Sequence, residues 1–406
     1  MRLTPRGTGF LVTAGSAFVA APLFSLPALQ YVTSLLLGLV VLGALFVIVG
    51  HARIRVERSF KPGVVTPGTP ARVHLQITNL RTIACLEARW NDTLPSALSG
   101  EAAGTLPALG GSHGPSARLE VDYPLHGLRR GRHSVGPLTV RVEDPFGLVQ
   151  RERTVGGRDD VVVLPRRVDV TGSGLLSRDS DGSGRPAPQH FGLGTDDVIA
   201  RTYLPGDALK RMHWKATAHR GELMVRQEEQ EIDARAGIVL DTDDVSFGTT
   251  CDAKGRWDHS SELEWSISAA ASVLTHLARQ GHEVAVRAVG GERRRVADHG
   301  DTIDDVLVDL ALLEPTTRTA VTRENVQTGE HTLVLLLGRL QADRAHAWVR
   351  AVAGADVKAF VAAGTRPPVL ELLEDAGWDV VTYAGGDDVA QRWSELGAGG
   401  ERHAAS

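Results

Sequence analysis

The longest stretch without a charged side chain sets the first constraint on this chain. Residues 10–49 contain no Asp, Glu, Lys or Arg, and one membrane-spanning helix needs only about 20 apolar residues. Turn-forming residues interrupt the stretch at Pro22, Ser25 and Pro27. We therefore expect two transmembrane helices, Gly9–Phe24 and Leu29–Val49, because backbone polar groups at membrane depth must be bonded within the chain. Residues 1–53 are predicted to form a transmembrane hairpin.

The flanking charges predict how this hairpin is oriented. Basic side chains precede the first helix and follow the second, at Arg2, Arg6, Arg53, Arg55 and Arg58. The turn between the helices has no Lys or Arg, so the positive-inside rule places both termini in the cytoplasm of a multi-pass membrane protein. Two alternatives stay open. Residues 1–28 could be a cleaved signal peptide, which would turn the chain outward, or the two segments could be buried helices of a soluble core.

Residues 54–170 are predicted to form an antiparallel β-sandwich-like domain. Three segments alternate apolar and polar residues with the period of two that a half-buried strand shows; they are Arg72–Thr78, Arg118–Tyr123 and Leu138–Val142. Turn signals separate them, and short strands at this spacing favour a sandwich. Asp144–Pro145–Phe146–Gly147 is predicted to be a turn held by its aromatic side chain. Residues 171–193, rich in Gly, Ser and Pro, are predicted to be a linker.

Residues 194–235 carry an unusual mixture of basic, aromatic and acidic side chains. Stacking aromatics beside arginines could bind single-stranded nucleic acid, and His190, His213 and His219 could form a metal or acid–base site. The six-residue spacing of His213 and His219 does not suit one helix face, and the net charge of −5 gives no general reason to expect a nucleic-acid partner. We expect instead a buried ion-pair and hydrogen-bond network that fixes this segment to its domain.

The same segment resembles the signature of the family called domain of unknown function 58. The residues that carry the resemblance are Arg201, Tyr203, Gly206, Asp207, Arg211, His213, Trp214, Lys215, Gly221 and Arg226. Gly131–His133, Gly136–Pro137 and Asp144–Leu148 resemble the stretch that precedes this signature in the family.

This resemblance implies a membrane-anchored protein with a von Willebrand factor A-like C-terminal domain. Members of the family are often encoded beside a MoxR-type AAA+ ATPase and a transglutaminase-like membrane protein. The resemblance therefore implies a partner in a chaperone-like or cell-envelope system of bacteria.

Residues 236–398 are predicted to form that α/β domain, followed by a disordered tail at 399–406. Apolar strands alternate here with helices of amphipathic pattern, which predicts a mostly parallel, doubly wound sheet. Ligands of such sheets bind beyond the carboxyl ends of the strands. The first strand is followed there by three acidic side chains, Asp241, Asp243 and Asp244.

The three aspartates are the candidate metal ligands. In von Willebrand A domains the pattern Asp-x-Ser-x-Ser starts a metal-binding loop at this place, and here Asp243 and Val245 stand at the two Ser positions. Carboxylate oxygens can bind a hard cation such as Mg²⁺, although capping and solvation of the loop explain the acids as well. We expect any Mg²⁺ binding to be weak.

The sequence shows no nucleophile–base pair. The two cysteines, Cys85 and Cys251, are too few for a disulfide scaffold or a cysteine-based metal site, and no Gly-x-Ser-x-Gly elbow is present. We therefore expect a membrane-anchored, cytoplasm-facing interaction or adaptor protein without a cofactor, not an enzyme. The alternative is a metal-dependent hydrolase that uses the acidic loop or His213.

Overall fold

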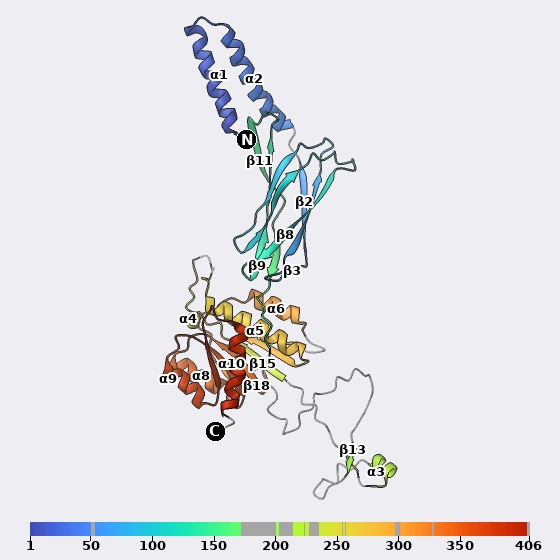
Figure 1. The fold of residues 1–406 in the computed structure, drawn as a ribbon, viewed down its shortest axis with the longest axis vertical. Helices are drawn as coiled ribbons and strands as arrows, with labels where there is room; N and C mark the ends of the chain where they lie inside the picture. The colour runs from blue at the N-terminus through green and yellow to red at the C-terminus, as the bar shows by residue number, and fades with distance from the viewer. Residues whose placement is uncertain are drawn as a thin grey trace.

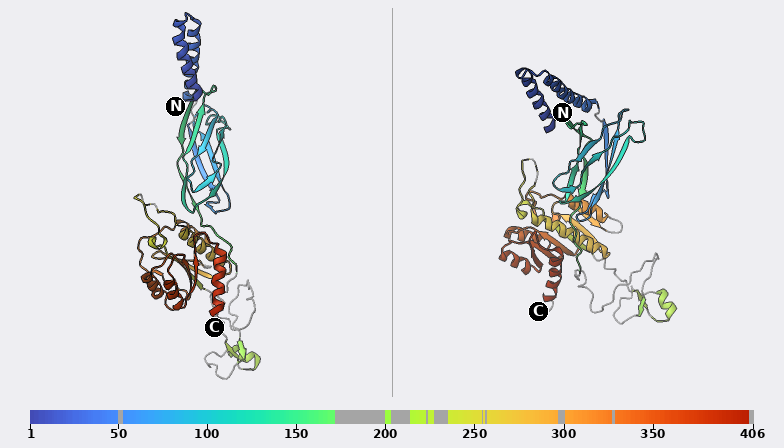
Figure 2. Two further views of the ribbon diagram at one scale, coloured as in Figure 1. Left: turned by 60° about the vertical axis from the view of Figure 1, so that its left-hand side comes forward. Right: turned by 45° about the horizontal axis from the view of Figure 1, so that its top comes forward.

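The protein is built from three successive parts along one long axis. A computed structural model describes residues 1–49, 53–171, 200–202, 214–222, 224–226, 235–253, 255, 257–296, 301–326 and 329–403. A helical hairpin stands at one end, a β-sandwich lies in the middle, and an α/β domain follows (Figures 1 and 2). The sandwich and the α/β domain each bury a core of apolar side chains, and a smaller cluster joins the hairpin to the sandwich.

The hairpin consists of α1, Pro5–Leu23, and α2, Ala28–Val49, which lie side by side (Figure 1). Thr4 caps α1 by accepting a hydrogen bond from the backbone N–H of Gly7. Pro5 suits the first position of the helix, because a backbone N–H there would have no acceptor within the helix and proline has none. α1 thus begins four residues before the predicted Gly9. By length and composition α2, with a mean hydropathy of 2.8, is the one described helix suited to cross a membrane.

The sandwich contains two antiparallel sheets that enclose a common core. One has the order β1-β11-β10-β5-β7 and the other β2-β4-β8-β6. The strands are β1 Arg2–Leu3, β2 Ile54–Lys61, β4 Ala71–Asn79, β5 Ala88–Asp92, β6 Leu98–Gly100, β7 Ala103–Leu106, β8 Arg118–Gly127, β10 Leu138–Glu143 and β11 Val149–Val155. The three predicted strands lie in β4, β8 and β10, so their alternating pattern located them correctly.

A third, smaller sheet lies at the sandwich end next to the α/β domain. It has the order β3-β12-β9, with β3 at Val64–Val65, β12 at Asp159–Val163 and β9 at Gly131–Val135. The β3–β12 pair is parallel, which the expectation of a wholly antiparallel domain did not include.

The turn between β10 and β11 joins the sandwich to the hairpin. Its Asp144 carboxylate is buried and accepts hydrogen bonds from the backbone N–H groups of Phe146, Leu148 and Val149, at 3.0, 2.7 and 2.6 Å. Phe146 is 51% exposed. The prediction that the aromatic side chain anchors this turn is therefore wrong, because the buried carboxylate holds it.

Both helices approach this turn closely. Thr4 donates its backbone N–H to the Leu148 carbonyl at 3.0 Å and its hydroxyl to the Gly147 carbonyl at 2.5 Å. A Cβ at Gly7 would lie 2.1 Å from the Leu148 oxygen, and one at Gly43 would lie 3.1 Å from the Asp144 carboxylate. The approach at Gly7 leaves no room for a side chain, and the one at Gly43 would require the Asp144 side chain to shift by a few tenths of an ångström. β1 adds two residues to the edge of β11.

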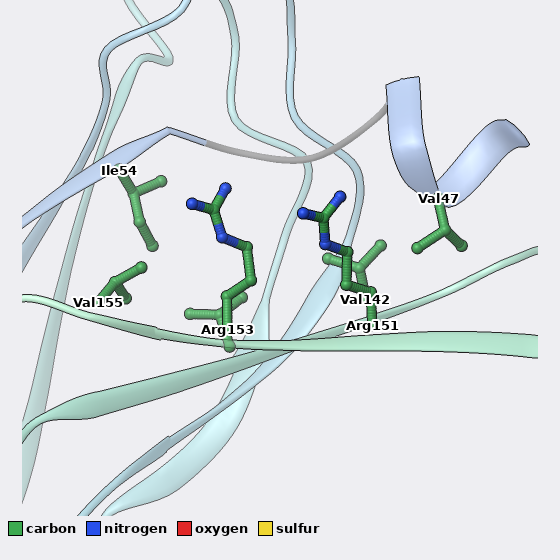
Figure 3. Close-up of a pocket in the computed structure, with 7 residues that line it drawn as sticks. Val47, Ile54, Val142, Arg151, Arg153 and Val155 are labelled. Atoms are coloured by element: carbon green, nitrogen blue, oxygen red, sulfur yellow. The ribbon is translucent and has the colours of Figure 1, made fainter. Parts of the chain in front are cut away.

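The end of α2 also rests on the sandwich. Val47 is fully buried there, in a small, mostly apolar pocket with Ile54, Val142 and Val155 (Figure 3). Arg151 and Arg153 of β11 extend into the space between Ile54 and Val47 (Figure 3). Arginine side chains thus lie beside the apolar helix at the place where it meets the domain.

The segment that follows β12 fixes the sandwich to the α/β domain. Leu164 and Val170 are buried in the core of the α/β domain. Along helix α5, Ser261–Arg279, the Val168 N–H donates to the Ser272 hydroxyl at 3.0 Å. Arg130, next to β9, forms an ion pair with Glu264 and donates to the Leu313 carbonyl at 2.8 Å. These contacts act as a second junction.

The α/β domain is a six-stranded sheet with helices on both faces, as the alternating pattern predicts. Its order is β17-β16-β15-β18-β19-β20, parallel except for the β16–β17 pair. The strands are β15 Arg235–Leu240, β16 Glu283–Ala288, β17 Arg293–Val296, β18 Thr332–Leu337, β19 Asp356–Ala362 and β20 Asp379–Tyr383. The central strands β15, β18 and β19 are buried on both sides, which explains why they are apolar runs.

The helices divide into two groups, one on each face of the sheet. α5, α6 (Ile303–Leu312) and α10 (Val389–His403) pack on one face, together with the short α4 (Asp244–Phe247). α7 (Arg323–Val326), α8 (Ala342–Ala351) and α9 (Pro367–Asp375) pack on the other. α10 extends into the segment expected to be a disordered tail, and residues 404–406 lie outside the described chain.

We predict that Asp144→Ala lowers the stability of the sandwich and its junction. Three backbone N–H groups lose their acceptor, and at about 1 kcal/mol or more for each the loss amounts to about 3 kcal/mol. Thermal unfolding of the full chain in detergent measures this loss. The neighbouring exposed Glu143→Ala is the control and should unfold with the parent. Equal melting temperatures for the two variants would contradict the assigned role of Asp144.

Candidate functional site

The carboxyl ends of β15 and β18 meet at the point where the strand order reverses. β16 lies on one side of β15, whereas β18 and the later strands lie on the other. Open α/β sheets bind ligands at such a switch point. β15 leads into Asp241 and β18 into Gly338 and Arg339, so the acidic loop predicted from the sequence does lie at this edge.

Asp241 is paired with a basic side chain from the neighbouring helix. Its carboxylate is fully buried and receives a hydrogen bond from Arg344 Nη2 at 2.7 Å and a longer one from Arg344 Nε at 3.4 Å. Arg344 stands in the first turn of α8, the helix that follows β18. Burial raises the pKa of Asp241, and the Arg344 guanidinium opposes that rise. The pair therefore compensates a charge that would otherwise be costly at this depth.

Asp243 shares the same guanidinium, but Asp244 does not. The Asp243 carboxylate is nearly buried, lies 3.7 Å from Arg344 Nη1 and accepts from the Ser246 hydroxyl at 3.4 Å. Asp244 is partly exposed and accepts from the N–H of Val245 at 2.8 Å, as a residue opening α4. The structure thus brings together two of the three predicted ligands and leaves the third in a local turn.

A chain segment after α6 lies across the loop and adds hydroxyl groups. Thr316 donates its N–H to the Thr242 carbonyl at 2.7 Å, and the two hydroxyls lie 2.8 Å apart. Thr319 donates its hydroxyl to that of Thr316 at 2.9 Å and accepts Arg344 Nη1 on its carbonyl at 3.2 Å. Sequence reasoning missed Arg344 and both threonines, because they lie 75 or more residues from Asp241 and follow no motif.

These residues do not fit a divalent cation well. The guanidinium of Arg344 lies 2.7 Å from an Asp241 oxygen and 3.7 Å from Asp243 Oδ1, so it already supplies positive charge to both carboxylates, although Asp243 Oδ1 accepts no hydrogen bond. Within the described part of the chain, no three His, Cys, Asp or Glu side chains are grouped to hold a metal ion. The arrangement can fix the shape of the edge, and it leaves the exposed side chains of Val245 and Arg339 as its outer surface.

The signature segment is described only in part. β13, Ala200–Thr202, pairs with β14, Met224–Arg226, so that Arg201 faces Val225 across the two strands. α3, Trp214–Arg220, lies between them in sequence and includes Lys215. Gly221 follows the helix with a φ of +74°, which suits glycine. Five predicted signature residues lie outside the described chain: Tyr203, Gly206, Asp207, Arg211 and His213. So does His190, whereas His219 is exposed in α3.

Comparison with known proteins gives a family match over part of the chain. Residues 199–358 match the family described as "Protein of unknown function DUF58". The chain is 23% identical over 175 residues to "Uncharacterized protein YeaD" of Bacillus subtilis (strain 168). That alignment covers 43% of this chain and 40% of the length of YeaD. The matched segment includes the signature and most of the α/β domain.

Two solved structures give weak likenesses. The CARDB domain of the PF1109 protein from Pyrococcus furiosus has a TM-score of 0.21 and 18% identity, covering 28% of this chain and 94% of that one. A cohesin module from Clostridium perfringens has a TM-score of 0.19 and 11% identity, covering 28% and 98%. At these scores the likenesses carry no argument about function.

We predict that Arg344→Met strongly destabilises the α/β domain. The change keeps an unbranched apolar stem but leaves two buried carboxylates without a cation, which typically costs about 3–5 kcal/mol. Chemical unfolding of the full chain in detergent measures the loss. Arg350→Met, an exposed change in the same helix, is the matched control and should leave unfolding unchanged.

The parent protein tests the metal hypothesis. A cation present at 100 times its dissociation constant would stabilise the fold by about 2.7 kcal/mol. Because Arg344 already supplies positive charge to the acids, excess Mg²⁺ or EDTA should leave the melting temperature of the parent protein unchanged. A rise of several degrees with Mg²⁺ in the parent protein would show that the acidic loop is a metal site.

Proposed function

We propose that this protein is a membrane-anchored interaction protein, and not an enzyme, whose α/β domain faces the cytoplasm and binds a partner. The hairpin is its anchor, and both helices cross the bilayer. The α/β domain is von Willebrand factor A-like and acts as the binding module. From the family resemblance we propose a MoxR-type AAA+ ATPase as partner, with a transglutaminase-like membrane protein as a further component, in a chaperone-like or cell-envelope system.

The observation that carries the anchor is the exposed apolar surface of the hairpin. Large apolar side chains of both helices are exposed, among them Val12, Phe18, Val19, Leu23, Tyr31, Leu35, Val41, Leu42 and Leu45. Exposure to water would cost roughly 25 cal/mol for each Å² of this surface. A patch of this extent is expected to be covered, and a bilayer is the cover that an uncharged helix the length of α2 fits.

The charges at the base of the hairpin support the orientation. Arg2 lies in β1, Arg6 lies in the first turn of α1, and Arg81 donates to the Val49 carbonyl at the end of α2, at 3.1 Å. All three lie at the sandwich end, and the hairpin tip between α1 and α2 has no charged side chain. Under the positive-inside rule the sandwich end is then cytoplasmic.

The carboxyl edge of the α/β sheet is the proposed contact for the partner. Its acids are held by Arg344, which favours a shaped surface over an open coordination site and weighs against the metal-dependent hydrolase. Val245 stands on this edge with 59% of its surface exposed, and among the described residues it is the large apolar side chain of the α/β domain that is most exposed. Nearby, Arg339 pairs with Glu262 at 2.9 Å.

We predict that Val245→Arg abolishes co-purification of the partner ATPase while the protein stays folded. A bulky charge on the contact cannot be buried without a counter-charge. The measurement is affinity purification of the tagged full chain from crosslinked native membranes, with the ATPase quantified by mass spectrometry. Asp375→Arg is the control, because Asp375 is exposed at the end of α9, which leads to the opposite sheet edge.

Two results would contradict this proposal. Equal recovery of the ATPase with Val245→Arg and with Asp375→Arg would show that the carboxyl edge is not the contact. Recovery of no ATPase with the parent protein, together with turnover of a substrate, would favour the hydrolase.

A further inference from the structure

The sandwich covers part of α2 that a domain lying wholly outside the membrane would leave free. Val40, Gly43 and Val47 of α2 are buried, and Val40 packs with Leu148 and Val149 of the sandwich. At about 1.5 Å per residue, Gly43 lies about 9 Å along the helix from its end at Val49. The turn between β10 and β11 therefore lies alongside the apolar helix, about 9 Å from its end in the direction of the hairpin tip.

The hairpin left free above this turn is shorter than a bilayer core. From Ala28 to Gly43, α2 spans about 22 Å, and from Gly7 to Leu23, α1 spans about 24 Å. The hydrocarbon core of a typical bilayer is about 30 Å thick. If α2 crosses the core with its full length of 22 residues, about 33 Å, then the turn beside Gly43 lies inside the lipid leaflet.

The turn has the composition that such a position requires. Polar backbone groups at membrane depth must be satisfied within the protein, and the Asp144 carboxylate accepts three of them while staying buried itself. Phe146, at the tip, is 51% exposed, and Pro145, which has no N–H, is exposed as well. The turn therefore presents an aromatic ring to its surroundings and hides its charge.

Basic side chains mark the expected level of the lipid head groups. Arg6 lies beside the turn, since a Cβ on Gly147 would be 3.7 Å from Arg6 Nη1. Arg151 extends toward the end of α2 at Val47 (Figure 3). Arginine stems can lie along apolar surface while the guanidinium reaches anionic phosphate. Arg6 and Arg151 thus place guanidinium groups beside the turn and beside the end of α2, where they can meet lipid head groups.

We propose that the Asp144–Leu148 turn enters the cytoplasmic leaflet of the membrane and that Phe146 inserts among the lipid chains near the head groups. The proposal rests on the membrane anchor proposed above. It adds a lipid contact by the sandwich itself, which holds the domain upright on the bilayer in addition to the hairpin.

A depth measurement on the full chain tests this proposal. Cys251→Ser removes the exposed cysteine, while Cys85 is buried. In that background, Phe146→Cys carries a fluorescent label, and the protein is reconstituted into vesicles of phosphatidylcholine and phosphatidylglycerol. Some lipids carry a nitroxide quencher on the acyl chain near the head group. Leu128→Cys is the matched control, because Leu128 is 62% exposed at the other end of the sandwich, beyond β8.

The expected result is loss of most of the fluorescence at position 146 and no loss at position 128. Flotation of the vesicles after an alkaline carbonate wash reports the anchor separately. Protein that floats but shows equal, weak quenching at both positions would overturn the lipid contact and leave the anchor standing. Protein that is washed off would overturn the anchor and, with it, this proposal. Pro145→Cys repeats the measurement from a second exposed position of the turn.

Discussion

The buried carboxylate of Asp144 is the contact on which the arrangement of the whole molecule depends. It organises one turn of the sandwich, and that turn lies against Gly43 of α2 while its Gly147 and Leu148 carbonyls bind Thr4. β1 adds a short strand pair to the same place. The hairpin is therefore held by backbone hydrogen bonds and close packing, so its direction follows from the sandwich and not from a free linker.

A second set of contacts passes this constraint on to the α/β domain. Leu164 and Val170 leave the sandwich and enter the core of the next domain, and Arg130 reaches Glu264 of α5. Within that domain, Arg344 and Asp241 fix the outer end of β15. A partner bound at the carboxyl edge would thus be held at a set distance from the bilayer, which suits the interaction role that we propose.

Local patterns predicted the elements, and contacts between distant residues decided how they join. The apolar run of α2 and the alternating pattern of β4 could be predicted, because the order of apolar and polar residues within each segment shows which of its side chains avoid water. Phe146 was misjudged because the aromatic side chain of a turn does not reveal whether it faces the core or the surroundings. The buried carboxylate of Asp241 requires a positively charged partner, and the sequence offers 44 lysines and arginines. Only the packing of α8 on the sheet brings Arg344, and not another of them, to Asp241. The antiparallel edge strand β17 was missed, because Arg293–Val296 carries three arginines.

The central claim is that the hairpin anchors the protein with its folded parts in the cytoplasm. The most direct test fuses a reporter after Ser406 of the full chain, in one version active only in the cytoplasm and in another active only outside it. Our account predicts activity of the cytoplasmic reporter alone, because the basic residues at the hairpin base stay inside. Activity of the external reporter alone would contradict it and would favour an outward-facing chain with a single anchor at residues 29–49.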